Sequence, residues 1–100
     1  MGNKFSGTIP DVFGSLTNLE LLHLHHNSFT GSVPASIGQT YHLQSFAVEN
    51  NPLTGKMPLG VCSLVIKGNL THLSIDCIKV QNGGESTGVE CNCCTECYFD

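Results

Sequence analysis

The chain has 100 residues, which is enough for about one domain. Lys and Arg together number 4 against 8 Asp and Glu, so the formal net charge is −4 with neutral histidines. Phosphate binding requires clustered basic side chains, and this composition therefore argues against a nucleic-acid partner. The stretch 21–48 lacks Asp, Glu, Lys and Arg, but His, Asn, Gly and Pro interrupt it and exclude a membrane-spanning helix there.

A short phrase recurs along the chain at a constant spacing of 24 residues. NKFSGTIP begins at Asn3, NSFTGSVP at Asn27 and NPLTGKMP at Asn51. Apolar residues outside the phrase match at the same spacing, as Leu19 and Leu43 do. Self-similarity of this kind predicts a solenoid, in which each coil buries its apolar side chains against its neighbours.

A short alternating segment accompanies the phrase. It reads LELLHL from Leu19, LQSFAV from Leu43 and LTHLSI from Leu70. Period-two alternation predicts a short strand whose apolar residues turn toward the core. The last of these segments arrives three residues late, because Leu73 lies 27 residues after Phe46.

The recurring phrase is predicted to form the corner of each coil, directly after the strand. Its asparagine can donate and accept hydrogen bonds, so Asn3, Asn27 and Asn51 are expected to stack in a ladder that satisfies backbone groups buried at the bend. The glycine four residues later suits a tight backbone. The proline that follows fixes φ and ends strand pairing.

These segments resemble the leucine-rich repeat, specifically its plant-type form with the unit L-x-x-L-x-L-x-x-N-x-L-x-G-x-I-P-x-x-L-G-x-L. The match covers about residues 3–76, although Thr40 replaces an expected Leu and Cys62 an expected Gly. The resemblance implies an α/β solenoid: a right-handed coil with short parallel strands on a concave face, and loops and 3₁₀ turns on the convex face. It also implies recognition of a protein or peptide, as in the extracellular halves of receptor-like kinases or in secreted inhibitors of hydrolases. This chain has no kinase signature.

Six cysteines are confined to the last part of the chain, and an even count crowded there predicts disulfides formed in an oxidising compartment. They are Cys62, Cys77, Cys91, Cys93, Cys94 and Cys97. A bond between adjacent Cys93 and Cys94 is disfavoured, because neighbouring Cα atoms lie about 3.8 Å apart and bridged ones roughly 4.4–6.8 Å. We favour bonds from Cys62 and Cys77 to the cluster at 91–97, which would fold the tail over the last open coil.

The expected domain organisation therefore has two parts. Residues 1–76 form about three repeats, the first of them truncated, and residues 77–100 form a cysteine-rich C-terminal cap. The cap is loosely similar to those of algal leucine-rich repeat proteins. Met1 stands where the repeat pattern expects the end of a strand, and no basic and then apolar leader precedes the first repeat. We therefore expect a fragment of, or an internal start within, a longer extracellular or cell-surface chain that carries further repeats.

The cysteine cluster has a second interpretation. Cys91, Cys93, Cys94 and Cys97 place four thiols within seven residues, and zinc favours four soft ligands. The chain would then be a structural terminator that binds a metal and no ligand. The spacing is unlike paired CxxC knuckles, so the disulfide cap is preferred. No cofactor is expected.

Residues between the inward positions of each strand are expected to face the concave side and to contact a partner. With strands about 4.8 Å apart, His25, Glu49 and Asp76 should form a row across three coils. Such a row admits a pH-sensitive contact or a metal-ligand set, since histidine titrates near neutrality, or only a solvated polar face. The candidate partner-binding residues are His23, His25, His26, Ala47, Glu49, Ser74 and Asp76.

Two further expectations concern chemistry. The sequence from Asn69 to Thr71 is the only N-x-S/T sequon in the chain, and it would receive a glycan in the secretory route. The chain contains no G-x-S-x-G motif, no glycine-rich phosphate loop and no grouping of nucleophile and base. We therefore expect no enzymatic activity.

Overall fold

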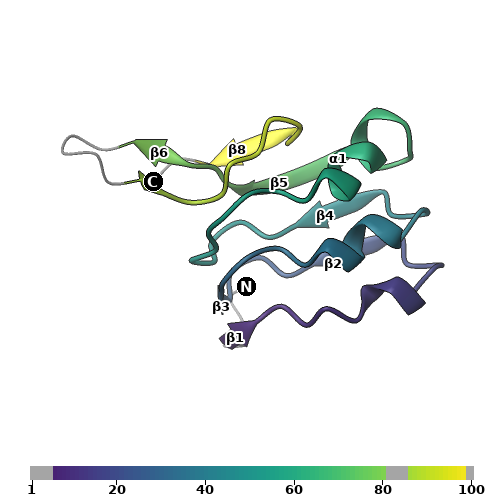
Figure 1. Ribbon diagram of the computed structural model, residues 1–100, viewed down its shortest axis with the longest axis horizontal. Coiled ribbons are helices and arrows are strands. Elements are labelled where there is room, and N and C mark those ends of the chain that lie inside the picture. Colours follow the sequence, from purple (N-terminus) through teal and green to yellow (C-terminus); the bar gives the residue numbers. More distant parts are fainter. Residues whose placement is uncertain (1–5, 81–85, 99–100) are drawn as a thin grey trace.

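The computed structural model describes residues 6–80 and 86–98, which wind into a stack of coils (Figure 1). The strands are β1 (Ser6–Thr8), β2 (Leu21–His23), β3 (Ser28–Thr30), β4 (Ser45–Ala47), β5 (His72–Asp76), β6 (Lys79–Val80), β7 (Ser86–Thr87) and β8 (Glu96–Tyr98). The helical elements are the 3₁₀ helices η1 (Phe13–Ser15) and η2 (Ala35–Gln39) and the α-helix α1 (Leu59–Ile66).

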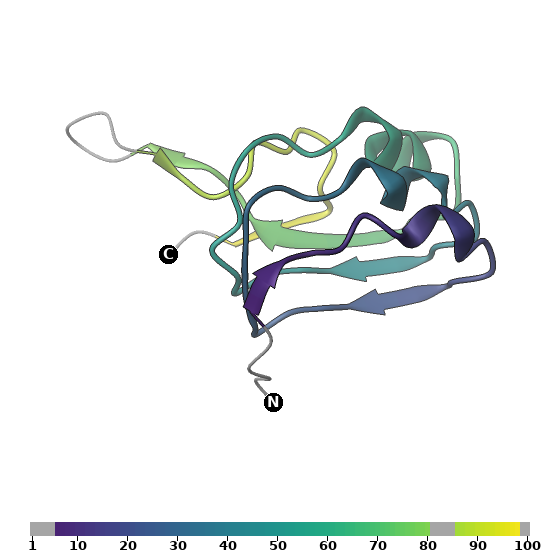
Figure 2. The same ribbon diagram turned by 60° about the horizontal axis from the view of Figure 1, so that its bottom comes forward.

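The main sheet contains four parallel strands in the order β2-β4-β5-β8. Phe46 pairs with Leu22 on one side and with Leu73 on the other, which confirms the spacings of 24 and 27 residues. Parallel pairing continues beyond the strand ends, because the Leu24 N–H donates to the Ala47 carbonyl at 2.8 Å. Strands β1 and β3 form a second, two-stranded parallel sheet at the corner of the coil (Figure 2).

The fourth strand of the main sheet comes from the cysteine-rich tail. Ile75 in β5 pairs with Cys97 in β8, and the Cys77 N–H donates to the Tyr98 carbonyl at 3.0 Å. The expected boundary at residue 77 marks a change of sequence pattern. Strands from both sides of this boundary nevertheless belong to the same sheet. The tail also forms the antiparallel pair β6–β7, which projects from the body of the coil.

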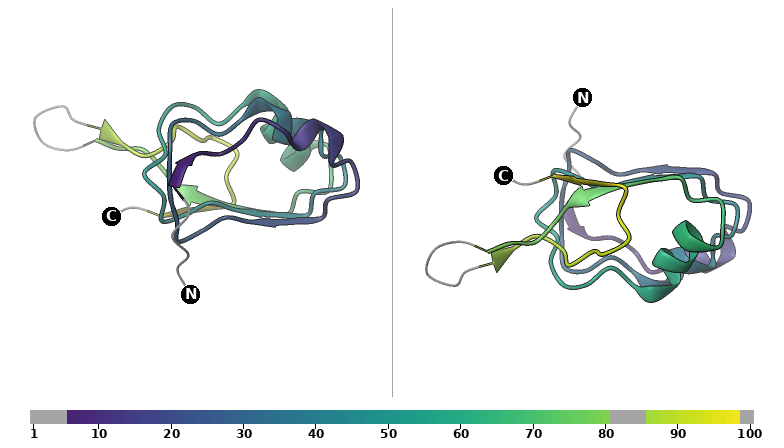
Figure 3. Two further views of the ribbon diagram at one scale, coloured as in Figure 1. Left: turned by 90° about the horizontal axis from the view of Figure 1, so that it is seen from below. Right: turned by 90° about the horizontal axis from the view of Figure 1, so that it is seen from above.

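The main sheet and the helical elements lie on opposite sides of the coil (Figure 3). The expected 3₁₀ turns are present in the first two coils, but the third coil carries an eight-residue α-helix instead. Its coil is three residues longer, and those residues extend the turn into α1. Gly38 lets α1 approach η2 closely, since a Cβ at this position would lie 2.9 Å from the Cα of Gly60.

The core fills the space between these two layers. Its side chains come from the repeats, at the positions that the repeat predicts, and with Val89 also from the tail. The large side chains with at most 2% exposure are Ile37, Leu43, Phe46, Val48, Leu53, Val61, Leu70, Leu73, Ile75 and Val89. The N-terminal coil is less complete, because Leu19, Leu22 and Leu24 are only partly buried against this core.

The asparagine ladder joins one coil to the next. Asn51 is 4% exposed, and its Nδ2 donates to the carbonyls of Leu24 at 2.9 Å and Val48 at 3.0 Å. Its Oδ1 accepts the N–H of Phe29 at 3.0 Å, so one side chain satisfies backbone groups of two coils. Asn27 is also buried and donates to the Leu24 carbonyl at 3.0 Å. Asn3 lies outside the described residues.

Glycine four residues after each ladder asparagine is required by backbone conformation. Gly7, Gly31 and Gly55 have φ values of 86°, 81° and 86°. A side chain disfavours this left-handed region, and glycine adopts it at no steric cost. The recurrence of the phrase thus follows from a corner that has the same backbone turn in all three coils and, at Asn27 and Asn51, equivalent hydrogen bonds from the amide to preceding carbonyls.

All six cysteines are paired, and both outlying cysteines reach the cluster, as the sequence favoured. The bonds are Cys62–Cys93, Cys77–Cys97 and Cys91–Cys94. The first ties α1 to the tail, and the second ties the end of β5 to β8. The tail is therefore held against the last repeat at two places, one on each side of the coil.

Replacing Asn51 tests the ladder. Asn51→Ala leaves two buried carbonyls and one N–H without their partner, and each such group costs about 1–3 kcal/mol. We expect the free energy of unfolding, measured by urea denaturation, to fall by at least about 3 kcal/mol. The control Asn18→Ala removes an exposed asparagine and should leave it unchanged. Equal stability of both variants would contradict this role for Asn51.

Removing disulfides tests how the tail is held. The Cys62–Cys93 bond spans 31 residues, whereas Cys91–Cys94 spans 3. Loop-closure entropy gives about 3–4 kcal/mol of stability for the longer loop and about 1.5 kcal/mol for the shorter. In chemical denaturation, Cys62→Ala/Cys93→Ala should therefore lose more stability than Cys91→Ala/Cys94→Ala. The reverse order would show that the tail contributes little to closing the coil.

Candidate functional site

The candidate site is the outward side of the main sheet, which we call the strand face. The helical elements cover the opposite side of the coil, so this face is open (Figure 3). Its residues alternate with the inward core residues of β2, β4, β5 and β8. They are Leu21, His23, His25, Ser45, Ala47, Glu49, His72, Ser74, Asp76, Glu96 and Tyr98, and Leu21, which pairs with Ser45, is 59% exposed.

One row across the strand face runs His23, Ala47, Ser74 and Glu96, according to the strand register. Its two central members are buried: Ala47 is 5% exposed and Ser74 is not exposed. Ala47 and Ser74 are both among the residues that the sequence predicts to contact a partner. Their side chains are too short to rise above longer neighbours, so they form the floor of the face.

The next row contains the three residues that the sequence aligned, His25, Glu49 and Asp76. The two acids bond to neighbours other than His25. Glu49 accepts a hydrogen bond from the Ser74 hydroxyl at 2.8 Å, and Asp76 accepts one from the Asn50 N–H at 2.8 Å. The three residues therefore lie in the predicted order across the coils. The hydrogen bonds of the two carboxylates join neighbouring coils within the strand face.

Three histidines gather at the N-terminal end of the strand face. The His25 ring packs edge-on against His23, with ring centroids 5.8 Å apart, and against His26, at 5.0 Å. His23 Nε2 lies 2.9 Å from the Ser45 hydroxyl, and His26 Nδ1 lies 3.0 Å from the Asn50 amide nitrogen. Nδ1 of His25 is buried and forms no hydrogen bond within the described part of the chain.

His26 and Asn50 occupy equivalent positions, one residue before a ladder asparagine. Both adopt left-handed backbone, with φ values of 59° and 60°. Non-glycine residues rarely adopt this conformation, although His and Asn are enriched in it. The turn at the strand end thus presents both side chains at the rim of the strand face, where both are exposed.

The tail contributes Glu96 and Tyr98, which the sequence analysis did not find. Nδ1 of His72 lies 3.4 Å from Oε1 of Glu96, and the Tyr98 hydroxyl donates to the other Glu96 oxygen at 2.8 Å. This hydrogen bond to a carboxylate, together with its negative charge, raises the pKa of the Tyr98 phenol above its ordinary value. No sequence pattern indicated β8, because its three residues lie outside the repeat period.

The strand face is acidic when its histidines are neutral. Glu49, Asp76 and Glu96 lie on it, Glu20 immediately precedes β2, and the four strands contain no Lys or Arg. Two lysines whose side chains are described lie elsewhere, Lys56 beside Glu90 and Lys67 after α1. The face can therefore attract positive charge, and protonation of its histidines would oppose that attraction.

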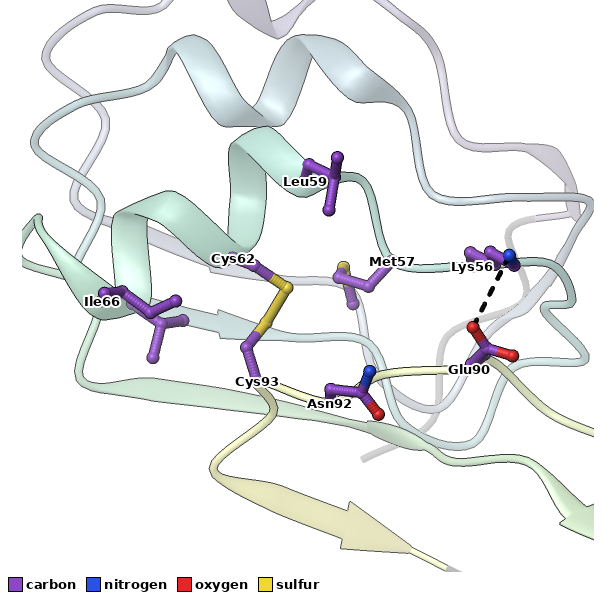
Figure 4. Close-up of a pocket in the computed structure, with 9 residues that line it drawn as sticks. Lys56, Met57, Leu59, Cys62, Ile66, Glu90, Asn92 and Cys93 are labelled. Atoms are coloured by element: carbon purple, nitrogen blue, oxygen red, sulfur yellow. Dashed lines mark ion pairs between the residues drawn. A yellow bond between two sulfur atoms is a disulfide. The ribbon is translucent and has the colours of Figure 1, made fainter.

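A hollow of about 470 Å³ lies on the helical side, between α1 and the tail (Figure 4). Apolar side chains and the Cys62–Cys93 disulfide line it, and Leu59 is 85% exposed. Its one ion pair, between Lys56 and Glu90 at 3.8 Å, is exposed and weak. The hollow offers fewer polar groups than the strand face.

The structure contradicts the four-thiolate metal interpretation. The sulfurs of the cluster are all in disulfides, so they cannot supply the thiolates that zinc requires. The described residues also contain no group of three or more His, Cys, Asp or Glu arranged to hold a metal ion. Within the same residues, no helix is long and apolar enough to cross a bilayer.

Comparisons with known proteins agree with the repeat pattern. The Leucine Rich Repeat family model matches residues 18–40. The BIR3–SERK2 complex from Arabidopsis thaliana contains a chain that is 32% identical over 73% of this chain, with a TM-score of 0.66. The plant peptide hormone receptor RGFR1, solved in complex with RGF2, is 39% identical over 67% of this chain, with a TM-score of 0.61.

This chain is a plant-type leucine-rich repeat protein. It spans 38% of the length of the matched chain in the BIR3–SERK2 complex and 10% of that of RGFR1. No curated protein matches it. The likeness therefore concerns the repeat coil, and the strand face corresponds to the row of parallel strands that such a coil displays.

The Glu96–Tyr98 contact of this leucine-rich repeat protein is testable by its ionisation. The chain has two tyrosines, so Tyr41→Phe isolates Tyr98. In this background the phenolate absorbance should appear at a pH above the ordinary tyrosine pKa. Adding Glu96→Gln removes the charged acceptor, and the titration should move to lower pH. An unchanged titration would show that Tyr98 does not bond to Glu96.

Proposed function

We propose that the chain is a protein- or peptide-recognition module of an extracellular leucine-rich repeat protein and that it binds its partner through the strand face. One observation carries the proposal. The coils align exposed polar and charged side chains from four adjacent strands on one open face, with their short neighbours Ala47 and Ser74 as a floor. Because successive coils repeat the same geometry, the strand face forms a continuous surface for an extended ligand.

The charge of the strand face indicates which ligand it would prefer. Glu49, Asp76 and Glu96 lie on the strand face, and its four strands contain no Lys or Arg, so a complementary partner would present positive charge. Glu49 and Asp76 are already oriented by hydrogen bonds to Ser74 and Asn50. Such preorganised acceptors lose little side-chain entropy when a ligand binds. We therefore infer a basic peptide or a basic protein segment as the partner.

Two further findings support this proposal. Both matched structures are named for complexes, one between BIR3 and SERK2 and the other between a peptide hormone receptor and RGF2. Three disulfides are typical of proteins that mature in an oxidising secretory compartment, which fits an extracellular location. No arrangement of catalytic groups is apparent in the described residues, so recognition without catalysis is the proposal.

Selection from a phage-displayed library of random peptides tests the proposed function. The disulfide-intact chain should enrich peptides with more Lys and Arg than the starting library. A selected peptide, made synthetically and labelled, should bind Glu49→Gln and Glu96→Gln at least about tenfold more weakly, which corresponds to about 1.4 kcal/mol. Glu90→Gln is the matched control, because it removes one negative charge beside Lys56, away from the strand face.

Two results would contradict the proposed function. Binding that is equal for the Glu49, Glu96 and Glu90 variants would contradict recognition through the strand face, and so would enrichment of acidic peptides.

A further inference from the structure

The connection between α1 and β5 projects at the end of the molecule opposite the C-terminus (Figures 1 and 2). It contains Asn69, Leu70 and Thr71, which form the chain's one N-x-S/T sequence. Leu70 is 1% exposed, and its N–H donates to the Leu64 carbonyl at 3.1 Å, whereas Asn69 and Thr71 are exposed. The buried leucine thus fixes the connection and leaves both flanking side chains in solvent.

The fold does not need an asparagine at position 69. The Asn69 side chain forms no hydrogen bond with any residue that the structure describes. Its backbone is not in the left-handed region, which would favour asparagine and which Asn50 occupies. Asn51, by contrast, makes three buried contacts through its amide. The free amide of Asn69 is therefore available for modification.

Thr71 has little structural role beyond its backbone. Its N–H donates to the Gln44 carbonyl at 3.0 Å, and this bond aligns the start of β5 with the preceding coil. The hydroxyl lies 3.3 Å from the same carbonyl oxygen, a long and exposed contact. A serine hydroxyl could replace it without loss, and an alanine would keep the backbone bond.

We propose that Asn69 carries an N-linked oligosaccharide. In the transfer, the Asn69 amide nitrogen bonds to the anomeric carbon of an oligosaccharide carried on a polyprenyl diphosphate. The carbon–oxygen bond to the diphosphate breaks, the polyprenyl diphosphate leaves with the electron pair, and the amide nitrogen loses one proton. The step involves no oxidation or reduction. Thr71 supplies the hydroxyl that the acceptor sequence requires.

The position of this glycan is compatible with recognition on the strand face. Asn69 lies three residues after Ile66, which ends α1 on the helical side and is 75% exposed. Asn69 also lies three residues before His72, the first residue of β5 and a member of the strand face. A glycan here would extend from the end of the coil, beyond the end of α1 and the start of β5. The inference rests on the secretory route in the proposed function and not on ligand binding.

Intact-mass measurement of secreted protein tests the inference. The full chain, placed behind a secretion signal in eukaryotic cells, should be secreted with an oligosaccharide that peptide N-glycosidase removes. Peptide mapping should place it at Asn69. Asn69→Gln and Thr71→Ala should each lack the modification, whereas Thr71→Ser should keep it. A thiol count on each variant should show six oxidised cysteines, which confirms folding independently of the glycan.

Wild-type protein that is secreted with six oxidised cysteines but without an oligosaccharide at Asn69 would overturn the inference. Modification that persists in Thr71→Ala would overturn it as well, because the acceptor sequence would then be irrelevant. The two proposals fail separately. A glycosylated chain that selects no basic peptides contradicts only the proposed function, and a peptide-binding chain without a glycan contradicts only this inference.

Discussion

The stacking of inward side chains from coil to coil is the constraint on which the rest of this protein depends. Phe46 is fully buried between Leu22 and Leu73 of the adjacent strands, and burial of such a side chain contributes about 1.5–3 kcal/mol. Because side chains alternate along a strand, fixing the inward residues also fixes the outward ones. Core packing therefore determines which polar residues lie side by side on the strand face.

The repeated part of the fold was predictable, because a corner that recurs with the same geometry in each coil requires the same residue types each time. A corner that buries backbone groups needs an amide such as that of Asn51, and its left-handed turn needs a glycine such as Gly55. The last strand was not predictable, since β8 belongs to no repeat. Its position depends on the long-range Cys77–Cys97 bond, and local sequence does not specify such pairing. The α-helix of the third coil was not predicted either, and it replaces the 3₁₀ turn in a coil that is three residues longer.

The candidate site was predictable to the same extent. Alternation placed His23, His25 and Glu49 on the strand face, but it could not show that Ala47 and Ser74 lie below the surface, because exposure depends on the size of neighbours from other coils. The contribution of the tail was missed for the reason that β8 was missed. The tail therefore closes the coil and also adds the acidic edge that supports the choice of a basic ligand.

Amide hydrogen exchange measured by NMR tests the stacked coil most directly. The N–H groups of Leu24, Val48 and Cys77 each donate to a carbonyl of the next coil, at 2.8, 2.9 and 3.0 Å. All three amides should exchange slowly in the disulfide-intact chain, and reduction should release Cys77 first, because its acceptor is in the disulfide-held tail. Fast exchange at Leu24 and Val48 in the oxidised protein would contradict the parallel stack and, with it, the strand face.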